Sequence, residues 1–222
     1  MKQKFLDPNI KNKSKTVEEK IQLFEHQGVM LPLPTEIEIS ESGTCNRKCS
    51  FCPRSAPNFD DRKEFISNSL HEKLCKELKE LNYMGTIRYS GFVEPLLDKN
   101  IFSLINMARK YLPESNIELV TNGDPLNLVR LNKLFKNGLN RILISAYDSK
   151  EDAEKLEALC LKANLNTKQY IVRHRYYSEN QDFGITLSNR SGLMENAEYK
   201  IESLKEPLKK PCYIPSYTFF LD

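Results

Sequence analysis

The sequence lacks a long apolar run, a secretory signal and a marked excess of either charge. No stretch approaches the roughly 18 apolar residues of a spanning helix, so membrane insertion is not expected. The basic N-terminus is not followed by an apolar segment, so we do not expect a signal peptide. Because 33 Lys and Arg face 30 Asp and Glu, nucleic acid is not an expected partner either. These absences leave a cytoplasmic enzyme or binding protein.

Length and composition fit that class. A chain of 222 residues has room for one full core and part of a second. Its 40% hydrophobic and 28% charged residues are typical of a soluble globular protein.

The six cysteines are unevenly distributed. Cys45, Cys49 and Cys52 lie within eight residues, and the other three are scattered. Without a secretory signal a disulfide framework is not expected. Clustered cysteines in a reducing compartment indicate metal ligands or a redox site.

Alternating and helical patterns repeat through the middle of the chain. A first helix is expected at 16–27. Helices of ten to fifteen residues alternating with strands are typical of βαβ units and a parallel sheet, so the predicted fold class is α/β. The expected strands are 36–42, 85–91, 116–121, 141–145, 167–177 and, as a sixth, 184–189. The later helices are expected to begin at Ser69 and to cover 101–112, 128–138 and 150–164.

Three regions are expected along the chain. Residues 1–35 form a lysine-rich tail and a helix, and residues 36–190 form the sheet and its helices. Residues 191–222 form a polar connector followed by an aromatic, strand-like segment. Since an apolar strand at the end of a chain leaves an unpaired edge, we expect this last region to be a second domain cut short.

Polar residues and cysteines follow the ends of four consecutive expected strands. The cysteine loop follows the first strand, the segment 91–95 follows the second, 121–123 the third, and Ser145 ends the fourth. The carboxyl edge of such a sheet is where active sites lie. The sequence therefore predicts one site at this edge.

Three thiolates can hold three corners of a [4Fe–4S] cluster, which normally takes four. One iron would then stay open to another ligand, as in catalytic metal sites. The alternative is a structural zinc, which needs four ligands. No nearby Cys or His supplies a convincing fourth, since His71 lies 19 residues beyond Cys52.

These motifs resemble the radical S-adenosylmethionine (radical SAM) superfamily. The resemblance rests on Cys-x3-Cys-x2-Cys after a first strand, with Phe51 before the last cysteine, and on the segment 91–97, similar to the family's Gly-Gly-Glu motif. Segments 121–123 and 144–145 match its next two strand ends. The resemblance covers about 36–190. It implies a partial (β/α) barrel of about six parallel strands, open on one side, with a [4Fe–4S] cluster and S-adenosylmethionine (SAM) as cofactors.

The resemblance also assigns roles to individual residues. Cys45, Cys49 and Cys52 would bind the cluster, and the methionyl group of SAM would chelate its open iron. A 5′-deoxyadenosyl radical would then remove a substrate hydrogen. The implied SAM-binding residues are Glu94 at the methionyl amine, Gly91 beside the methionyl group, Phe51 near the adenine, Ser145 at the ribose, and Asn122 in the same pocket.

The sequence departs from the family pattern at Val93, where many members have a second glycine. We expect Val93 to alter the pocket without abolishing SAM binding, provided that its backbone avoids glycine-only geometry. Arg173 and Arg175 fall on one face of the fifth strand. They either line the lumen, facing an anionic group, or belong to a solvated edge.

The last region resembles the approach to SPASM, a cysteine-rich extension that holds auxiliary clusters in some radical SAM proteins. Only ten residues follow Cys212, so the extension is expected to be truncated, and Cys212 is either a stranded ligand or a plain buried thiol. Cys75 and Cys160 are expected to be buried, and His26 and His71 to lie at the surface.

The sequence thus predicts a radical SAM enzyme that acts on a peptide or a small molecule. The substrate classes that the resemblance implies are peptides, protein side chains and sugars. Flavodoxin or ferredoxin is the expected electron donor. Two alternatives remain: a non-catalytic iron–sulfur module that serves redox transfer or partner binding, and a zinc-stabilised scaffold.

Overall fold

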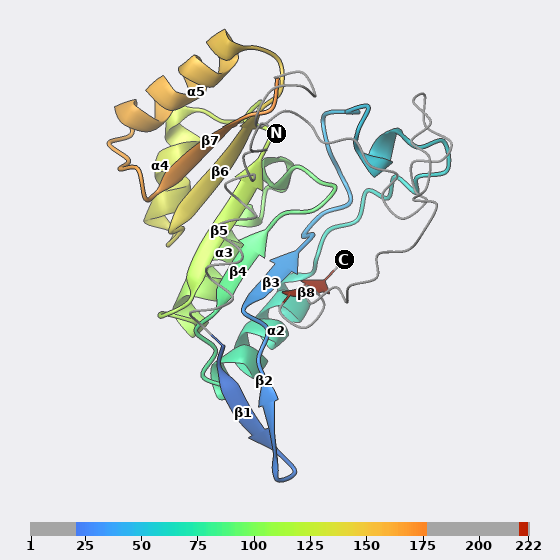
Figure 1. Cartoon of the computed structure of the whole chain (residues 1–222), viewed down its shortest axis with the longest axis vertical. Coiled ribbons are helices and arrows are strands. Elements are labelled where there is room, and N and C mark those ends of the chain that lie inside the picture. The colour runs from blue at the N-terminus through green and yellow to red at the C-terminus, as the bar shows by residue number, and fades with distance from the viewer. Residues whose placement is uncertain (1–20, 177–217, 222) are drawn as a thin grey trace, which may run out of the picture.

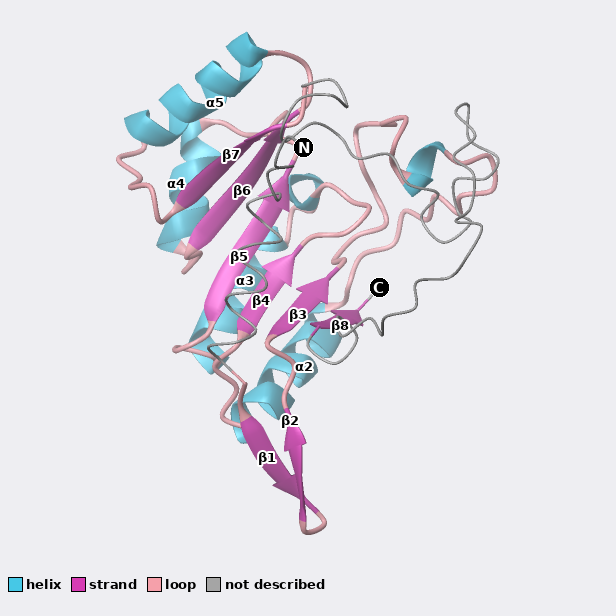
Figure 2. Cartoon of the chain, viewed as in Figure 1, coloured by secondary structure: helices cyan, strands magenta, loops and turns pink. Residues whose placement is uncertain are grey.

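A computed structural model describes residues 21–176 and 218–221. Six strands form one parallel sheet in the order β7-β6-β5-β4-β3-β8. Helices α2 to α5 pack along its outer side (Figures 1 and 2). The strands are β3 (Glu36–Ile39), β4 (Thr86–Tyr89), β5 (Asn116–Thr121), β6 (Arg141–Ala146), β7 (Tyr170–His174) and β8 (Thr218–Leu221). The helices are α2 (Asn68–Glu80), α3 (Ile101–Tyr111), α4 (Leu128–Lys136) and α5 (Lys150–Lys162), with short 3-10 turns η1 (Pro53–Ser55) and η2 (Pro95–Leu97).

The parallel pairing confirms the α/β class and the open, partial barrel. At one edge of the described sheet, β8 pairs in parallel with β3. The predicted strand at 184–189 lies outside the described residues. Local patterning marks 218–221 as a strand, but it cannot indicate that this strand joins the far edge of the same sheet.

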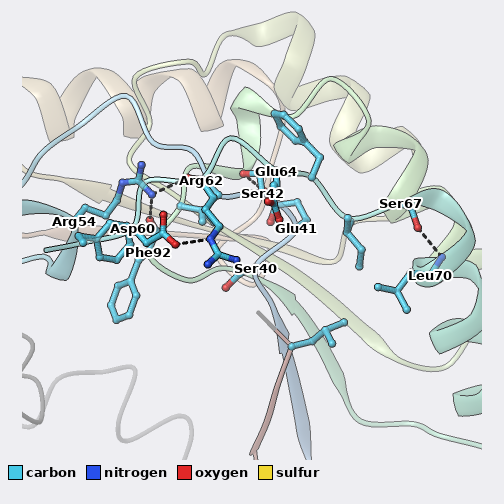
Figure 3. Close-up of a pocket in the computed structure, with 16 residues that line it drawn as sticks. Ser40, Glu41, Ser42, Arg54, Asp60, Arg62, Glu64, Ser67, Leu70 and Phe92 are labelled. Carbon is cyan, nitrogen blue, oxygen red and sulfur yellow. Dashed lines mark hydrogen bonds and ion pairs between the residues drawn. The ribbon is translucent and has the colours of Figure 1, made fainter.

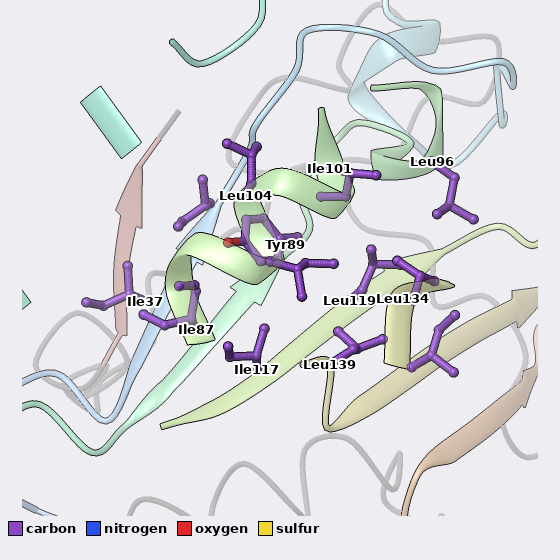
Figure 4. Close-up of a cluster of buried hydrophobic side chains, with 14 of the residues drawn as sticks. Ile37, Ile87, Tyr89, Leu96, Ile101, Leu104, Ile117, Leu119, Leu134 and Leu139 are labelled. Atoms are coloured by element: carbon purple, nitrogen blue, oxygen red, sulfur yellow. The ribbon is translucent and has the colours of Figure 1, made fainter. Parts of the chain in front are cut away.

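The two faces of the sheet differ in polarity because side chains alternate along each strand. Ile37, Ile87 and Ile117 belong to the buried core that the helices cover (Figure 4). The other face of the sheet carries Arg88, which donates to Glu36 at 2.6 Å and to Glu118 at 2.7 Å. Both carboxylates are buried, so this face carries a paired charge network instead of an apolar core.

Three helices begin directly after an N-cap residue, whose side chain accepts a hydrogen bond from the backbone N–H three residues later. The caps are Ser67 for α2, Asn127 for α4 and Ser149 for α5. Helix α2 therefore begins at Asn68, one residue before the predicted start. Within the described chain, no helix combines the length and the apolar character needed to span a membrane.

The predicted helix at 16–27 is wrong in its described part. Leu23–His26 is strand β1, which pairs with β2 (Val29–Pro32) in an antiparallel hairpin. Gln27 and Gly28 form the two-residue turn, both with positive φ, the geometry that a tight hairpin requires. Hydrophobic residues three or four apart in the sequence are compatible with a helix or with a hairpin. The turn at Gln27 and Gly28 makes this segment a hairpin. The hairpin extends from the end of the sheet opposite the cysteine loop (Figure 1).

His71 is fully buried, not at the surface as predicted. Its Nε2 lies 2.8 Å from the hydroxyl of Tyr89 on β4, so a sheet residue provides the polar partner that makes burial possible. Burial lowers the pKa of His71 to about 4. His26 is exposed, and Cys75 and Cys160 are buried, all as predicted.

Candidate functional site

All eight predicted site residues line one pocket at the carboxyl edge of the sheet. Besides the three cysteines, the pocket wall includes Phe51, Gly91, Glu94, Asn122 and Ser145. These residues come from four separate segments, which follow or end β3, β4, β5 and β6. The predicted meeting of the strand ends is therefore present. The volume is about 90 Å³, below the roughly 300–1,000 Å³ of ligand pockets.

The three clustered thiols are half-buried and lie in a loop with little regular structure. The N–H of Cys52 donates to the carbonyl of Cys49 at 2.9 Å, and the N–H of Arg47 lies 3.4 Å from the sulfur of Cys45. Burial, with a smaller contribution from Cys52, raises the pKa of Cys49 to about 11.

Within the described chain, no three His, Cys, Asp or Glu side chains gather as they would around one metal ion. A cluster does not demand that geometry, because each thiolate binds a different iron. Three thiols without a fourth protein ligand are the donor set that such a cluster with one open iron requires. The residues present therefore fit the group.

His71 does not complete a zinc site with the clustered cysteines. It lies on α2 beneath the sheet, where its Nε2 faces Tyr89 and its Nδ1 faces Met107 at 3.5 Å. The one fourth ligand that the sequence offered for zinc is therefore engaged elsewhere.

Gly91 needs to be glycine for a backbone reason. Its φ is +134°, a region that residues with a Cβ rarely enter. A Cβ atom there would also lie 2.3 Å from the hydroxyl oxygen of Ser40 on the neighbouring strand's extension. Val93 has no such requirement, since it is absent from the described residues with positive φ. The backbone at Val93 thus avoids glycine-only geometry, as predicted.

Glu94 is buried and joins the ends of β4 and β5. Its Oε1 accepts from the hydroxyl of Thr121 at 2.7 Å, and its Oε2 accepts from the N–H of Asn122 at 2.7 Å. The N–H of Leu96 is a third donor, at 3.1 Å from Oε1. Burial raises the pKa of Glu94 despite these donors. A carboxylate oxygen can accept two hydrogen bonds, so Oε2 retains capacity for a ligand amine.

Phe51 and Ser145 each have a partner that the sequence did not indicate. The ring of Phe51 packs against Tyr147, with centroids 5.3 Å apart. Ser145 is buried, and its hydroxyl accepts from Arg173 of β7 at 2.6 Å. Arg173 thus reaches the pocket wall, which favours the lumen interpretation over a solvated edge.

Arg47, Asp124 and Asp148 form a connection that sequence reasoning missed. The guanidinium of Arg47 bonds both carboxylates. Asn46 is also part of this connection, because it donates to Asp124 and accepts from the amide of Asn122 at 2.8 Å. The available signal was position, because Asp124 and Asp148 each follow a strand end at the predicted edge.

A larger cavity of about 610 Å³ adjoins the cysteine pocket. The two share Arg54, Phe92 and Val93. Figure 3 shows polar and aromatic side chains mixed around it. Its wall includes the hydroxyls of Ser40, Ser42 and Ser67, the charges of Asp60, Arg62 and Glu64, and the rings of Phe59, Phe65 and Phe92.

Comparisons with known proteins agree with this geometry. A Niallia circulans relative, S-adenosyl-L-methionine-dependent 2-deoxy-scyllo-inosamine dehydrogenase, is 28% identical over 180 residues, which cover 81% of this chain. The matched part is 66% of that relative, just under two thirds of its length. The crystal structure of BtrN in complex with AdoMet and 2-DOIA matches with a TM-score of 0.67 and 25% identity, covering 86% of this chain and 70% of that one.

The model of the Radical SAM superfamily matches residues 39–198. That range contains the three clustered cysteines and every predicted SAM-binding residue. It ends before Cys212, so the SPASM-like extension stays a prediction. Because the match covers well over half of the sequence, the chain belongs to the radical SAM superfamily, whose members use S-adenosylmethionine and a [4Fe–4S] cluster.

Proposed function

We propose that this protein is a radical SAM dehydrogenase that oxidises a hydroxyl-bearing carbon of a small, polar, ring-shaped substrate, such as an aminocyclitol or a sugar. The observation that carries the proposal is the convergence of all eight predicted site residues on one pocket. The similarity to an inosamine dehydrogenase supports the reaction and the substrate class. Among the substrates expected from sequence, it favours a ring over a peptide.

The chain's own residues divide the work within the pocket. Cys45, Cys49 and Cys52 would hold the cluster through their thiolates. When bound, the reduced cluster and SAM supply a 5′-deoxyadenosyl radical that removes a hydrogen atom from carbon. Glu94 would accept from the methionyl ammonium, because a carboxylate binds a charged donor strongly.

The remaining pocket residues would position SAM. Gly91 keeps its backbone free of a side chain beside the methionyl group. Phe51 would pack near the adenine. The buried hydroxyl of Ser145 and the amide of Asn122 would bind the ribose side.

The 610 Å³ cavity is the proposed substrate site. It shares Phe92 and Val93 with the cysteine pocket, so a ligand there would adjoin the pocket proposed for SAM. Its volume lies in the range of small-molecule sites. Its serine hydroxyls and ionic groups can both donate to and accept from hydroxyl and amino groups, and its phenylalanine rings can cover the apolar faces of a ring.

The reaction has to balance in electrons. Removing a hydrogen atom from a carbinol carbon produces 5′-deoxyadenosine and a carbon-centred radical that still bears its hydroxyl. Loss of the hydroxyl proton and one electron then gives the ketone. We propose that a separate iron–sulfur protein of the ferredoxin class accepts that electron. Flavodoxin or ferredoxin would deliver the first electron.

Electron paramagnetic resonance (EPR) of anaerobically reconstituted, dithionite-reduced protein tests the cofactor assignment. We expect a [4Fe–4S] signal whose shape changes when SAM is added. Cys49→Ala should abolish cluster assembly, whereas Cys75→Ala, at a buried thiol on α2, should leave it intact. Equal iron loss in both variants would contradict the ligand assignment. A cluster signal that does not respond to SAM would favour the non-catalytic iron–sulfur module.

The substrate assignment needs a separate test. We expect 5′-deoxyadenosine to accumulate with an aminocyclitol or an amino sugar, together with a product two hydrogens lighter. A bulky Leu70→Trp variant should reduce turnover without altering the SAM-induced EPR change, because Leu70 lines the 610 Å³ cavity and is not among the residues that line the cysteine pocket. If short peptides support turnover and ring substrates do not, the proposed substrate class is wrong.

A further inference from the structure

We propose that Arg47 is a positioning residue that clamps the cysteine loop to the ends of β5 and β6 and thereby holds the SAM pocket in register. This inference rests on the proposed ligand role of the three cysteines. It assigns a function to a loop residue that lines the cysteine pocket and is not among the residues that line the proposed substrate cavity.

The clamp consists of one guanidinium and two carboxylates. Arg47 Nε donates to Asp124 Oδ2 at 2.6 Å, and Nη2 donates to the other Asp124 oxygen. On the other side, Nη1 and Nη2 donate to the two oxygens of Asp148, both at 2.7 Å. Each pair is bidentate, the geometry that favours arginine over lysine.

The position of this clamp decides what it can hold. Arg47 lies between Cys45 and Cys49, while Asp124 follows β5 and Asp148 follows β6. The loop after β3 is thus tied to the second and third strands away, across the end of β4. Those strand ends carry Asn122 and Ser145, so the clamp sets the distance between the proposed cluster ligands and the proposed SAM ligands.

Neighbouring contacts show that the clamp is part of a larger interface. Asn46 donates to Asp124 Oδ2 at 2.7 Å. The guanidinium carbon of Arg47 lies 5.7 Å from the ring centroid of Tyr147, and Tyr147 packs on Phe51. The Arg47 side chain is only 19% exposed, unlike an ordinary surface arginine.

Asn46 also attaches the loop to the end of β5, since it donates to Asp124 and accepts from the amide of Asn122. Arg47 extends this attachment to Asp148, which follows β6. Within the loop, the bond from the Cys52 N–H to the carbonyl of Cys49 fixes local shape but not the place of the loop on the sheet. If Arg47 is removed, Asp124 and Asp148 face each other without their shared cation, and their repulsion favours an open loop.

The test compares Arg47→Ala and Arg47→Lys with Lys48→Ala. Lys48 is an exposed cation in the same loop and serves as the matched control. The lysine at position 47 keeps the charge but cannot form two bidentate pairs. SAM binding is measured by titrating the EPR change. We expect both Arg47 variants to weaken it by about 10- to 100-fold, the range for residues that orient metal ligands. Lys48→Ala should match the wild type.

A second readout does not depend on the cofactors. The clamp is formed by protein groups alone, so Arg47→Ala should lower the Tm of the metal-free protein by about 2–4 °C. Circular dichroism before heating establishes that each variant is folded. Asp148→Asn, which removes one carboxylate and keeps the side-chain shape, should give a smaller decrease in Tm.

The outcomes separate this inference from the proposed function. If Arg47→Lys behaves as wild type, the residue acts through charge alone and the clamp is refuted. If Arg47→Ala matches Lys48→Ala in both readouts, the contacts have no positioning role, which also refutes it. If even the wild type assembles no cluster, the cofactor assignment fails, and the Tm of the metal-free variants still decides whether Arg47 fastens the loop.

Discussion

Replacing Glu41 by glutamine should remove a large part of the pH dependence of folding stability between pH 4.5 and 8. Glu41 follows β3 and is fully buried. Its Oε1 lies 3.3 Å from the hydroxyl of Ser42, and its Oε2 has no hydrogen-bond partner within the described chain. Burial, reinforced by the nearby charges of Asp98 and Glu94, raises the pKa of Glu41 from 4.5 to about 8.

The sign and size follow from proton linkage. Between pH 4.5 and 8 the folded protein retains a proton on Glu41 that the unfolded chain has lost. Stability from this group is therefore complete below pH 4.5 and falls as the pH rises towards 8. At 1.36 kcal/mol per pH unit, the loss is about 5 kcal/mol at most. Glutamine resembles the neutral acid in shape and does not ionise, so Glu41→Gln should not incur this loss.

The assay is urea unfolding of the metal-free wild type and variant from pH 4.5 to 8.5, followed by circular dichroism because the chain has no tryptophan. The difference in unfolding free energy between the two proteins cancels the titration of other groups. It should grow in favour of the variant as the pH rises. Glu64→Gln, at an exposed carboxylate of the same cavity, controls for the change in net charge. A difference that stays constant with pH would refute the reasoning.

Three further substitutions test other parts of the structure. Glu94→Gln should weaken SAM binding in an EPR titration while iron content stays unchanged, and should cost about 1–3 kcal/mol of stability in urea unfolding because a buried donor loses its acceptor. Gly91→Ala should destabilise by about 1–3 kcal/mol, and by more than Gly28→Ala, whose Cβ would meet nothing within 4 Å; equal effects would contradict the close approach to Ser40. His71→Gln should reduce the loss of stability when the pH falls from 6.5 to 4. The unfolded chain protonates His71 before the folded protein does, and this costs the wild type about 3 kcal/mol of unfolding free energy. Equal losses of unfolding free energy in wild type and variant over this pH range would contradict the prediction.

The strands, helices and site residues that the sequence predicted share a physical property: local pattern determines them. Alternation places Ile37 and Ile87 in the core whatever lies far along the chain. The strand ends meet because parallel strands point the same way, so Gly91, Asn122 and Ser145 could be placed together from sequence. The domain boundaries at 35 and 190 rest on composition and on the extent of the family resemblance, and they stay predictions.

The burial of His71 and the place of β8 in the sheet could not be predicted, because a distant partner decides each of them. His71 is a polar residue on a buried helix position, where the hydroxyl of Tyr89, 18 residues later, is its hydrogen-bond partner. Strand β8 joins an edge formed by β3, about 180 residues earlier in the chain. Neither partner can be identified from spacing, because many polar residues and many strands could have filled the role.

Arg47 illustrates why charge in a loop is weak evidence about electrostatics. As an isolated cation beside the cysteines, it would ease reduction of the cluster. Paired with Asp124 and Asp148, however, it belongs to a group whose formal charge is −1, because one cation faces two carboxylates. Arg47 also holds the pKa of Asp148 below its ordinary value, so this carboxylate stays ionised near neutral pH. Reduction of a cluster at this site is therefore opposed by the group as a whole. Asp148→Asn, which makes the group neutral, should raise the midpoint potential, whereas Arg47→Ala should lower it; shifts in the same direction would mean that loop position outweighs charge in setting the potential.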